Sequence, residues 1–90
     1  MKSKLKDVNP ENNFWASDGR SIKNLFELAD VLESMSHETF SSHVNEHKND
    51  FSAWLNDVVG AKELAVKMGE IKDKTQSHVS VLKYIVNQVR

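Results

Sequence analysis

Residues 21–35 read SIKNLFELADVLESM, and this stretch carries the clearest helical pattern in the chain. At about 100° per residue its apolar side chains fall on one broad arc, and its charged side chains take the other side. The arc consists of Ile22, Leu25, Phe26, Leu28, Ala29 and Leu32. Ser21 precedes the pattern, and a serine at that place accepts hydrogen bonds from the first free amides of a helix. The stretch therefore predicts a helix over residues 22–35 with Ser21 as its N-cap.

Three shorter helices are predicted downstream, over residues 37–46, 51–59 and 61–68. Each combines a polar or glycine boundary with apolar side chains that recur every three or four residues. Ser36 is the predicted cap of the first, and Asp50, or Asn49 beside it, is the predicted cap of the second. Trp54 lies in the middle of the apolar arc of the second helix, so we expect it in the core.

The N-terminal residues have a different composition. Residues 1–13 are polar, contain Pro10, and are predicted to form a flexible arm. A first apolar cluster over residues 14–16 is followed by the pair Asp18-Gly19, which favours a tight turn because glycine tolerates positive φ. We therefore expect a short β-turn or two-stranded hairpin before the first helix.

Residues 70–90 are amphipathic when they are drawn as a helix. Their apolar arc consists of Ile71, His78, Val81, Leu82, Ile85, Val86 and Val89. Residues 78–89 are rich in β-branched side chains, which leaves a strand open, but their length and period favour a helix. The prediction is a mainly α fold of four to five helices. A core domain covers residues 14–69, and an amphipathic helix over 70–90 packs on that core or on a partner.

The composition narrows the classes of function. The chain has 90 residues, with 12 basic and 13 acidic side chains and no cysteine. A domain of this size has a thin core and little wall for a catalytic cleft, so we expect a non-catalytic protein without a cofactor. The lack of cysteine excludes disulfides and thiolate chemistry. No apolar run is long enough for a membrane span or a signal peptide, which predicts a cytoplasmic protein.

Charge is distributed unevenly along the chain. Residues 21–59 carry seven acidic side chains against two basic ones, and residues 60–90 carry six basic against three acidic. The C-terminal lysines are Lys62, Lys67, Lys72, Lys74 and Lys83. They fall at scattered helical angles rather than in one row, a pattern that does not favour nucleic acid as a partner.

Two histidines are the candidates for metal or acid–base chemistry. His43 and His47 are four residues apart, so one helical face would present both to a single ion. A zinc site needs a third ligand, which His37, Glu46 or Asp50 would have to supply. The chain has no cysteine to help and lacks the glutamate position of the zincin motif. We therefore expect part-buried structural histidines, and keep a metal site as the weaker hypothesis.

The segment from Phe14 to Met68 contains the strings HVN at 43–45 and KNDF at 48–51, followed by Trp54. With this core it resembles the prokaryotic family named domain of unknown function 5752. The resemblance implies a compact helical accessory domain, which occurs as a short stand-alone protein or attached to larger proteins, some of them carbohydrate-active enzymes. It implies no established activity and no catalytic residue. Residues 70–90 lie outside it.

Three hypotheses for function follow. The first is a non-catalytic protein-interaction or adaptor module that binds a protein partner, or a second copy of itself, through residues 70–90. Its candidate interaction surface consists of Trp15, Ile71, His78, Leu82, Ile85 and Val89. The alternative is an accessory domain that binds a ligand or nucleic acid with Trp15 as a stacking platform, together with the basic C-terminal region. The third is the metal site at His43 and His47.

Overall fold

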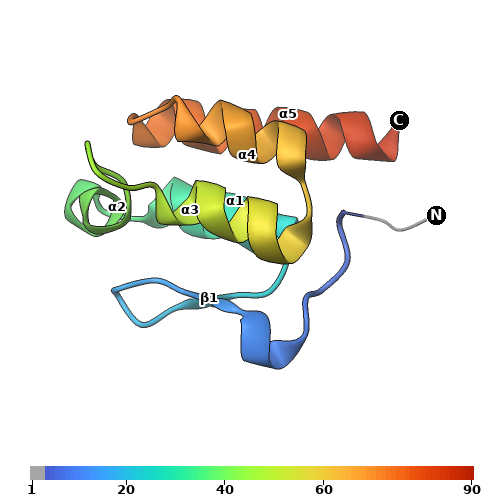
Figure 1. Cartoon of the computed structure of the whole chain (residues 1–90), viewed down its shortest axis with the longest axis horizontal. Coiled ribbons are helices and arrows are strands. Elements are labelled where there is room, and N and C mark those ends of the chain that lie inside the picture. Colours follow the sequence, from blue (N-terminus) through green and yellow to red (C-terminus); the bar gives the residue numbers. More distant parts are fainter. Residues whose placement is uncertain (1–3) are drawn as a thin grey trace.

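The structure is a computed structural model that describes residues 4–90, and it confirms a mainly helical fold with a small N-terminal hairpin (Figure 1). The first element of the described residues is a 3-10 turn, η1 (Pro10–Asn12), which is followed by the strands β1 (Phe14–Trp15) and β2 (Ser21–Ile22). The helices are α1 (Leu25–Ser34), α2 (His37–His43), α3 (Asp50–Trp54), the π-helical η2 (Leu55–Val59), α4 (Lys62–Gly69) and α5 (Lys74–Val89).

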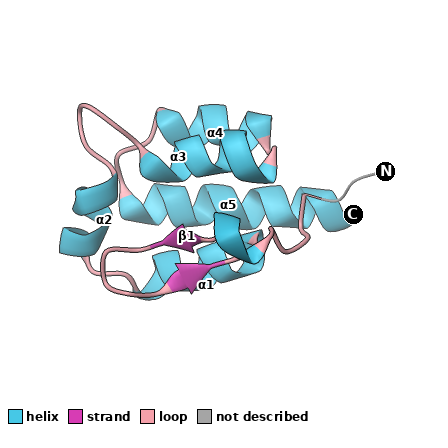
Figure 2. Ribbon diagram, turned by 60° about the horizontal axis from the view of Figure 1, so that its bottom comes forward, coloured by secondary structure: helices cyan, strands magenta, loops and turns pink. Residues whose placement is uncertain are grey.

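The elements are stacked in three levels. Helices α4 and α5 lie on one side of the domain, α1 and α3 form the middle, and the hairpin covers the opposite side (Figure 1). Figure 2 shows the two strands in front of the helices, with α2 at one end. The principal contacts join α1 to α5, α3 to α4 and α4 to α5. One hydrophobic core therefore runs through all three levels.

The hairpin forms where the sequence predicts it. Gly19 has φ 98°, a conformation that glycine adopts without steric cost. The strands pair antiparallel, with Phe14 opposite Ile22 and Trp15 opposite Ser21. Because successive side chains of a strand point to opposite faces, Phe14 enters the core and Trp15 faces outward.

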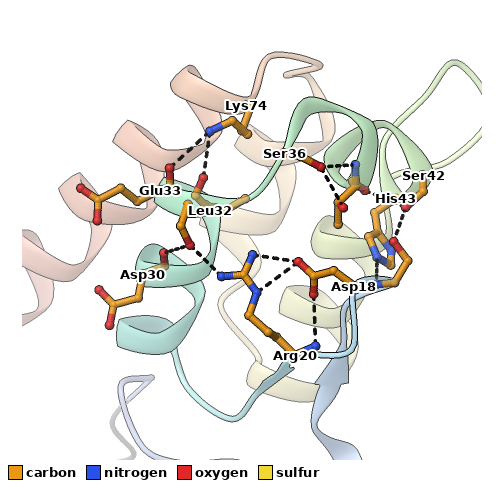
Figure 3. Close-up of polar contacts among 12 residues, drawn as sticks. Asp18, Arg20, Asp30, Leu32, Glu33, Ser36, Ser42, His43 and Lys74 are labelled. Atoms are coloured by element: carbon orange, nitrogen blue, oxygen red, sulfur yellow. Dashed lines mark hydrogen bonds and ion pairs between the residues drawn. The ribbon is translucent and has the colours of Figure 1, made fainter.

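Arg20 fastens the hairpin turn to α1. Its guanidinium donates to the carboxylate of Asp18 at 2.8 Å and to the hydroxyl of Ser34 at 2.6 Å (Figure 3). The hydrogen bonds from the side chain and the backbone of Arg20 lower the pKa of Asp18 from its ordinary value. The turn is thus held at the C-terminal end of α1.

Helix α1 starts later than predicted, and its cap is a different residue. The side-chain oxygen of Asn24 accepts a hydrogen bond from the backbone N–H of Glu27 at 2.8 Å. The prediction of Ser21 as the cap is wrong, because Ser21 belongs to β2 and pairs with Trp15. Pairing keeps that backbone extended, so the chain turns into a helix only after β2 has ended.

Helix α2 has the predicted cap but ends early. The hydroxyl of Ser36 accepts from the N–H of Thr39 at 3.0 Å, which confirms Ser36 as the N-cap. The helix stops at His43 rather than at residue 46, because Val44 leaves it to form an isolated antiparallel bridge with Asn49. The residues between them form a bend.

At the start of α3 the cap is Asn49, one of the two residues considered. Its side-chain oxygen accepts from the N–H of Ser52 at 3.0 Å. The prediction of Asp50 as the cap is wrong. Asp50 is the first residue of the helix, and its carboxylate binds His43 and Lys48. At the far end of this segment Gly60 has φ 80°, and the helical run ends at Val59, which confirms the predicted end at residue 59.

Residues 74–89 form a helix, which settles the choice between helix and strand. Val81 is fully buried, and Ile85 joins the same hydrophobic cluster as the side chains of α1 and α4. Helix α5 therefore packs on the core, as one of the two predicted arrangements. The core is correspondingly not confined to residues 14–69.

The described part of the N-terminal segment is held against the domain. Leu5 and Val8 pack on the core, and the N–H of Val8 donates to the carbonyl of Lys23 at 2.8 Å. The indole N–H of Trp54 donates to the carbonyl of Asn12 at 2.8 Å. The interpretation of residues 1–13 as a flexible arm is therefore wrong for residues 4–13, and residues 1–3 lie outside the described residues. Within residues 4–90, none of the helices is both long and apolar enough to cross a membrane.

Candidate functional site

His43 is one of the buried polar side chains of the described residues. It is the last residue of α2 and is 8% exposed. Its ring lies 5.0 Å from that of Phe14 and 5.4 Å from that of Phe51, measured between centroids. The imidazole is thus enclosed by aromatic side chains from β1 and α3.

Both ring nitrogens of His43 have partners. Nε2 lies 2.9 Å from the backbone nitrogen of Ser17, and Nδ1 lies 2.9 Å from the carboxylate of Asp50. A backbone N–H can only donate, so Nε2 is the acceptor. The geometry therefore assigns the proton of the neutral ring to Nδ1, which donates it to Asp50. This cluster of Ser17, His43 and Asp50 is called the histidine latch below.

The histidine latch contains the residue types of a serine-nucleophile triad. In such a triad Nε2 accepts the hydroxyl proton of the serine, but here its lone pair is taken by the backbone of Ser17. The hydroxyl of Ser42 donates to the carbonyl of Thr39 at 2.6 Å, so the Ser17 hydroxyl is the donor in the 2.8 Å contact between the two serines (Figure 3). The arrangement joins the hairpin to α2 and α3 and leaves no activated hydroxyl.

Asp50 is the charged member of the histidine latch. Partial burial of its carboxylate favours the neutral form, but hydrogen bonds from His43 and Lys48 outweigh this and lower the pKa of Asp50 from its ordinary value. The ammonium group of Lys48 lies 3.0 Å from the same oxygen that receives the histidine proton. Asp50 is therefore ionised at neutral pH and orients the ring of His43.

The structure does not present His43 and His47 on one helical face. Helix α2 ends at His43, and His47 lies exposed in the following bend, where its N–H donates to the side chain of Asn45 at 2.9 Å. Within the described residues, no three His, Cys, Asp or Glu side chains lie close enough to hold a metal ion.

The two tryptophans have opposite environments. Trp54 is buried, as predicted, and its indole N–H is satisfied by the carbonyl of Asn12. Trp15 is 64% exposed on the outer face of the hairpin. Of the two, Trp15 is the one that can stack on a ligand.

The candidate surface on residues 70–90 is divided by the structure. Ile85 is buried in the core and is closed to a partner, whereas Ile71 and His78 are half-buried. Leu82 and Val89 are exposed, as an interaction surface requires. Helix α5 therefore has one apolar face in the core and another that is exposed, so only part of the predicted surface is open to a partner.

The second apolar face of α5 consists of Val79, Leu82, Val86 and Val89. We call this set the α5 stripe. Its members are 41% to 64% exposed. They are spaced by three, four and three residues and lie about 120° around the helix from the buried Val81. The predicted surface does not include Val79 and Val86. The spacing of three, four and three residues along the sequence is the pattern that indicates both.

Positive charge borders the α5 stripe. Residues 74–90 contain Lys74, Lys83 and Arg90 and no acidic side chain. Lys74 is used internally: its ammonium group donates to the carbonyls of Leu32 and Glu33 at 3.1 and 3.5 Å, at the negative end of the α1 dipole (Figure 3). Lys83 and Arg90 form no ion pair within residues 4–90.

A groove between α4 and α5 adjoins the α5 stripe. One depression of about 240 Å³ is lined by Lys67, Ile71, Val79 and Lys83, together with neighbouring polar residues. A second, of about 130 Å³, shares Lys67 and Lys83 and continues to Tyr84. Burial, with a smaller contribution from the charge of Glu63, raises the pKa of Tyr84. Lysines from two helices thus line one groove beside an apolar face.

Comparison of the chain with protein-family models, with curated proteins and with solved structures yields no match.

Proposed function

We propose that this chain is a cytoplasmic, non-catalytic protein-interaction or adaptor module that binds a protein partner through the α5 stripe. The single observation that carries the proposal is that α5 already fills the core with one face and exposes four large apolar side chains on another. Single exposed apolar residues are ordinary on protein surfaces, but an aligned group marks a contact site.

The size of the α5 stripe fits a small interface. Val79 and Val89 are ten residues apart, which corresponds to about 15 Å along a helix. Apolar area removed from water contributes about 25 cal/mol per Å², so covering this face favours association. A contact of these dimensions supports transient rather than permanent binding.

Differential co-purification tests this proposal. The tagged chain, the Leu82→Glu/Val86→Glu variant and a Val66→Glu control are used to capture proteins from a lysate, with quantification by mass spectrometry. Val66 is 66% exposed on α4 and lies outside the α5 stripe, so its change places one such glutamate at an exposed apolar position elsewhere. We expect specific partners to be lost by the double variant and kept by the control. Partners that survive the double variant unchanged would contradict the proposal.

A second candidate function is favoured by the exposure of Trp15. An indole that is 64% exposed on a hairpin can stack on a nucleobase or a sugar ring. Titration of the chain with single-stranded oligonucleotides or oligosaccharides, followed by tryptophan fluorescence, tests it. Quenching that disappears in Trp15→Ala would favour this accessory-domain function over the first.

Membership of the family named domain of unknown function 5752 is also a proposal. The strings that carry the resemblance contain the latch residues His43 and Asp50, the cap Asn49 and the core side chains Phe51 and Trp54. These residues act in folding. The resemblance therefore supports a shared helical fold, and the α5 stripe lies outside it.

A further inference from the structure

We infer that the α5 stripe, with the α4–α5 groove beside it, binds an amphipathic α-helix with acidic edges that belongs to another protein. This inference rests on the proposed function and adds the chemistry of the partner. Three features of the described residues carry it: the spacing of the stripe, the cations along its border, and the size of the apolar face.

The spacing of the stripe matches a helix-to-helix contact. Residues 79, 82, 86 and 89 follow the three–four alternation with which one helix presents a seam to another. The residues belong to one continuous helix, so the seam is straight and rigid. An apolar seam of about 15 Å accommodates about three turns of a partner helix. Helix-in-groove binding uses anchors with this repeat.

The charges around the seam select the partner. Lys83 follows Leu82 on α5, and Lys67 faces the same groove from α4. Neither lysine forms an ion pair within residues 4–90, and the groove contains a single acid, Glu63. Arg90 adds a further cation at the end of the seam. Unpaired cations on the rim of an apolar contact favour a partner with carboxylates at matching positions and disfavour a basic one.

A second copy of the chain fits this surface less well. Residues 74–90 of both copies carry cations and no acids, so two seams facing each other bring only like charges together. A stable dimer also buries about 800 Å² per partner, which a seam of about 15 Å does not supply. A helix with acidic edges avoids the repulsion and suits a weak, reversible contact.

The test uses synthetic helical peptides as probes for the full chain. The acidic peptide has about 16 residues, enough for about four turns, with leucines in the three–four spacing and glutamates on both edges. A basic peptide replaces every glutamate with lysine, and a scrambled peptide keeps the acidic composition without the spacing. Binding is followed by NMR of the isotopically labelled chain, while fluorescence anisotropy gives the dissociation constants at about 50 and about 500 mM salt.

The expected result is saturable binding of the acidic peptide alone, with chemical-shift changes centred on Val79, Leu82, Lys83 and Val86, and weaker binding at high salt. Lys83→Glu should weaken binding about fivefold. The matched control is Lys62→Glu, which lies on α4 outside the groove. It should leave the binding of the acidic peptide unchanged. Circular dichroism verifies that both exposed variants remain folded.

Several outcomes would overturn the inference. Equal binding of the acidic and basic peptides would contradict the proposed preference for negative charge. Chemical-shift changes centred away from α5 would contradict the proposed binding surface. Concentration-dependent dimerisation that Leu82→Glu/Val86→Glu abolishes would assign the seam to a second copy. If no peptide binds, yet the double variant still loses its co-purified partner, the proposed function stands. Only the inference that the partner is an acidic helix is then wrong. If capture does not depend on the stripe, the proposed function fails first.

Discussion

Replacing His43 by alanine should destabilise the domain by about 3–4 kcal/mol. The change removes two hydrogen bonds, to Ser17 and Asp50, and net contributions of buried hydrogen bonds are about 1 kcal/mol each. It also removes a ring packed between Phe14 and Phe51, and the remaining void adds about 2 kcal/mol. Native domains have about 5–15 kcal/mol of stability, so the loss is large.

Urea unfolding followed by tryptophan fluorescence measures this free energy, with the buried Trp54 as the reporter of the core. His43→Phe separates the two contributions, because it keeps an aromatic ring and loses both hydrogen bonds; it should destabilise by about 1–2 kcal/mol. The exposed His47→Ala is the control and should change stability by less than about 0.5 kcal/mol. A His43→Ala variant as stable as the wild type, or an equal effect in His47→Ala, would refute the histidine latch.

Three further predictions concern the pH dependence, the first helix and the last. The pKa of Asp50 is lower in the folded state than in the unfolded state. Its stabilising contribution is therefore fully present above the unfolded pKa and is lost as the pH falls through the folded pKa. In urea unfolding between about pH 2 and pH 6, the free energy of unfolding should fall less steeply with acid in Asp50→Asn than in the wild type. Asn24→Ala should lower stability by about 1 kcal/mol in thermal melts, whereas Ser21→Ala should change it by less than about 0.5 kcal/mol; the reverse order would restore Ser21 as the cap. Truncation after Gly69 should abolish cooperative melting, because Val81 and Ile85 share the core with α1; a truncated chain that melts like the full one would contradict this.

The parts of the fold that were predictable are those encoded by neighbouring residues. The apolar period of α1, the serine before α2 and the glycine after η2 each express a preference that acts within a few residues. Trp54 could be assigned to the core because its helical arc has one apolar side. Such features need no knowledge of the rest of the chain.

The errors arose where a distant segment determines the role of a residue. Ser21 has the chemistry of a cap, but pairing with Trp15 keeps it in a strand. Asp50 also has that chemistry, and His43 takes its carboxylate. The backbone of Ser17 donates a hydrogen bond to His43, 26 residues further along the chain, and no local sequence pattern predicts such a contact.

The candidate site was predictable only in outline. The sequence located the apolar surface of α5, but it could not divide that surface between core and solvent. The division depends on how α1 and α4 pack against the helix, which leaves Leu82 exposed and buries Ile85. Once the buried face is known, the remaining spacing of three, four and three residues becomes visible.

Site-specific photo-crosslinking in the producing cells tests the central claim most directly. The photoreactive residue p-benzoylphenylalanine is placed at Val86, within the α5 stripe, or at Val66, which is at least as exposed on α4. Irradiation should give a covalent protein adduct from position 86 and none from position 66. Adducts of equal yield at both positions, or no protein adduct at position 86, would contradict the assignment of α5 as the docking face.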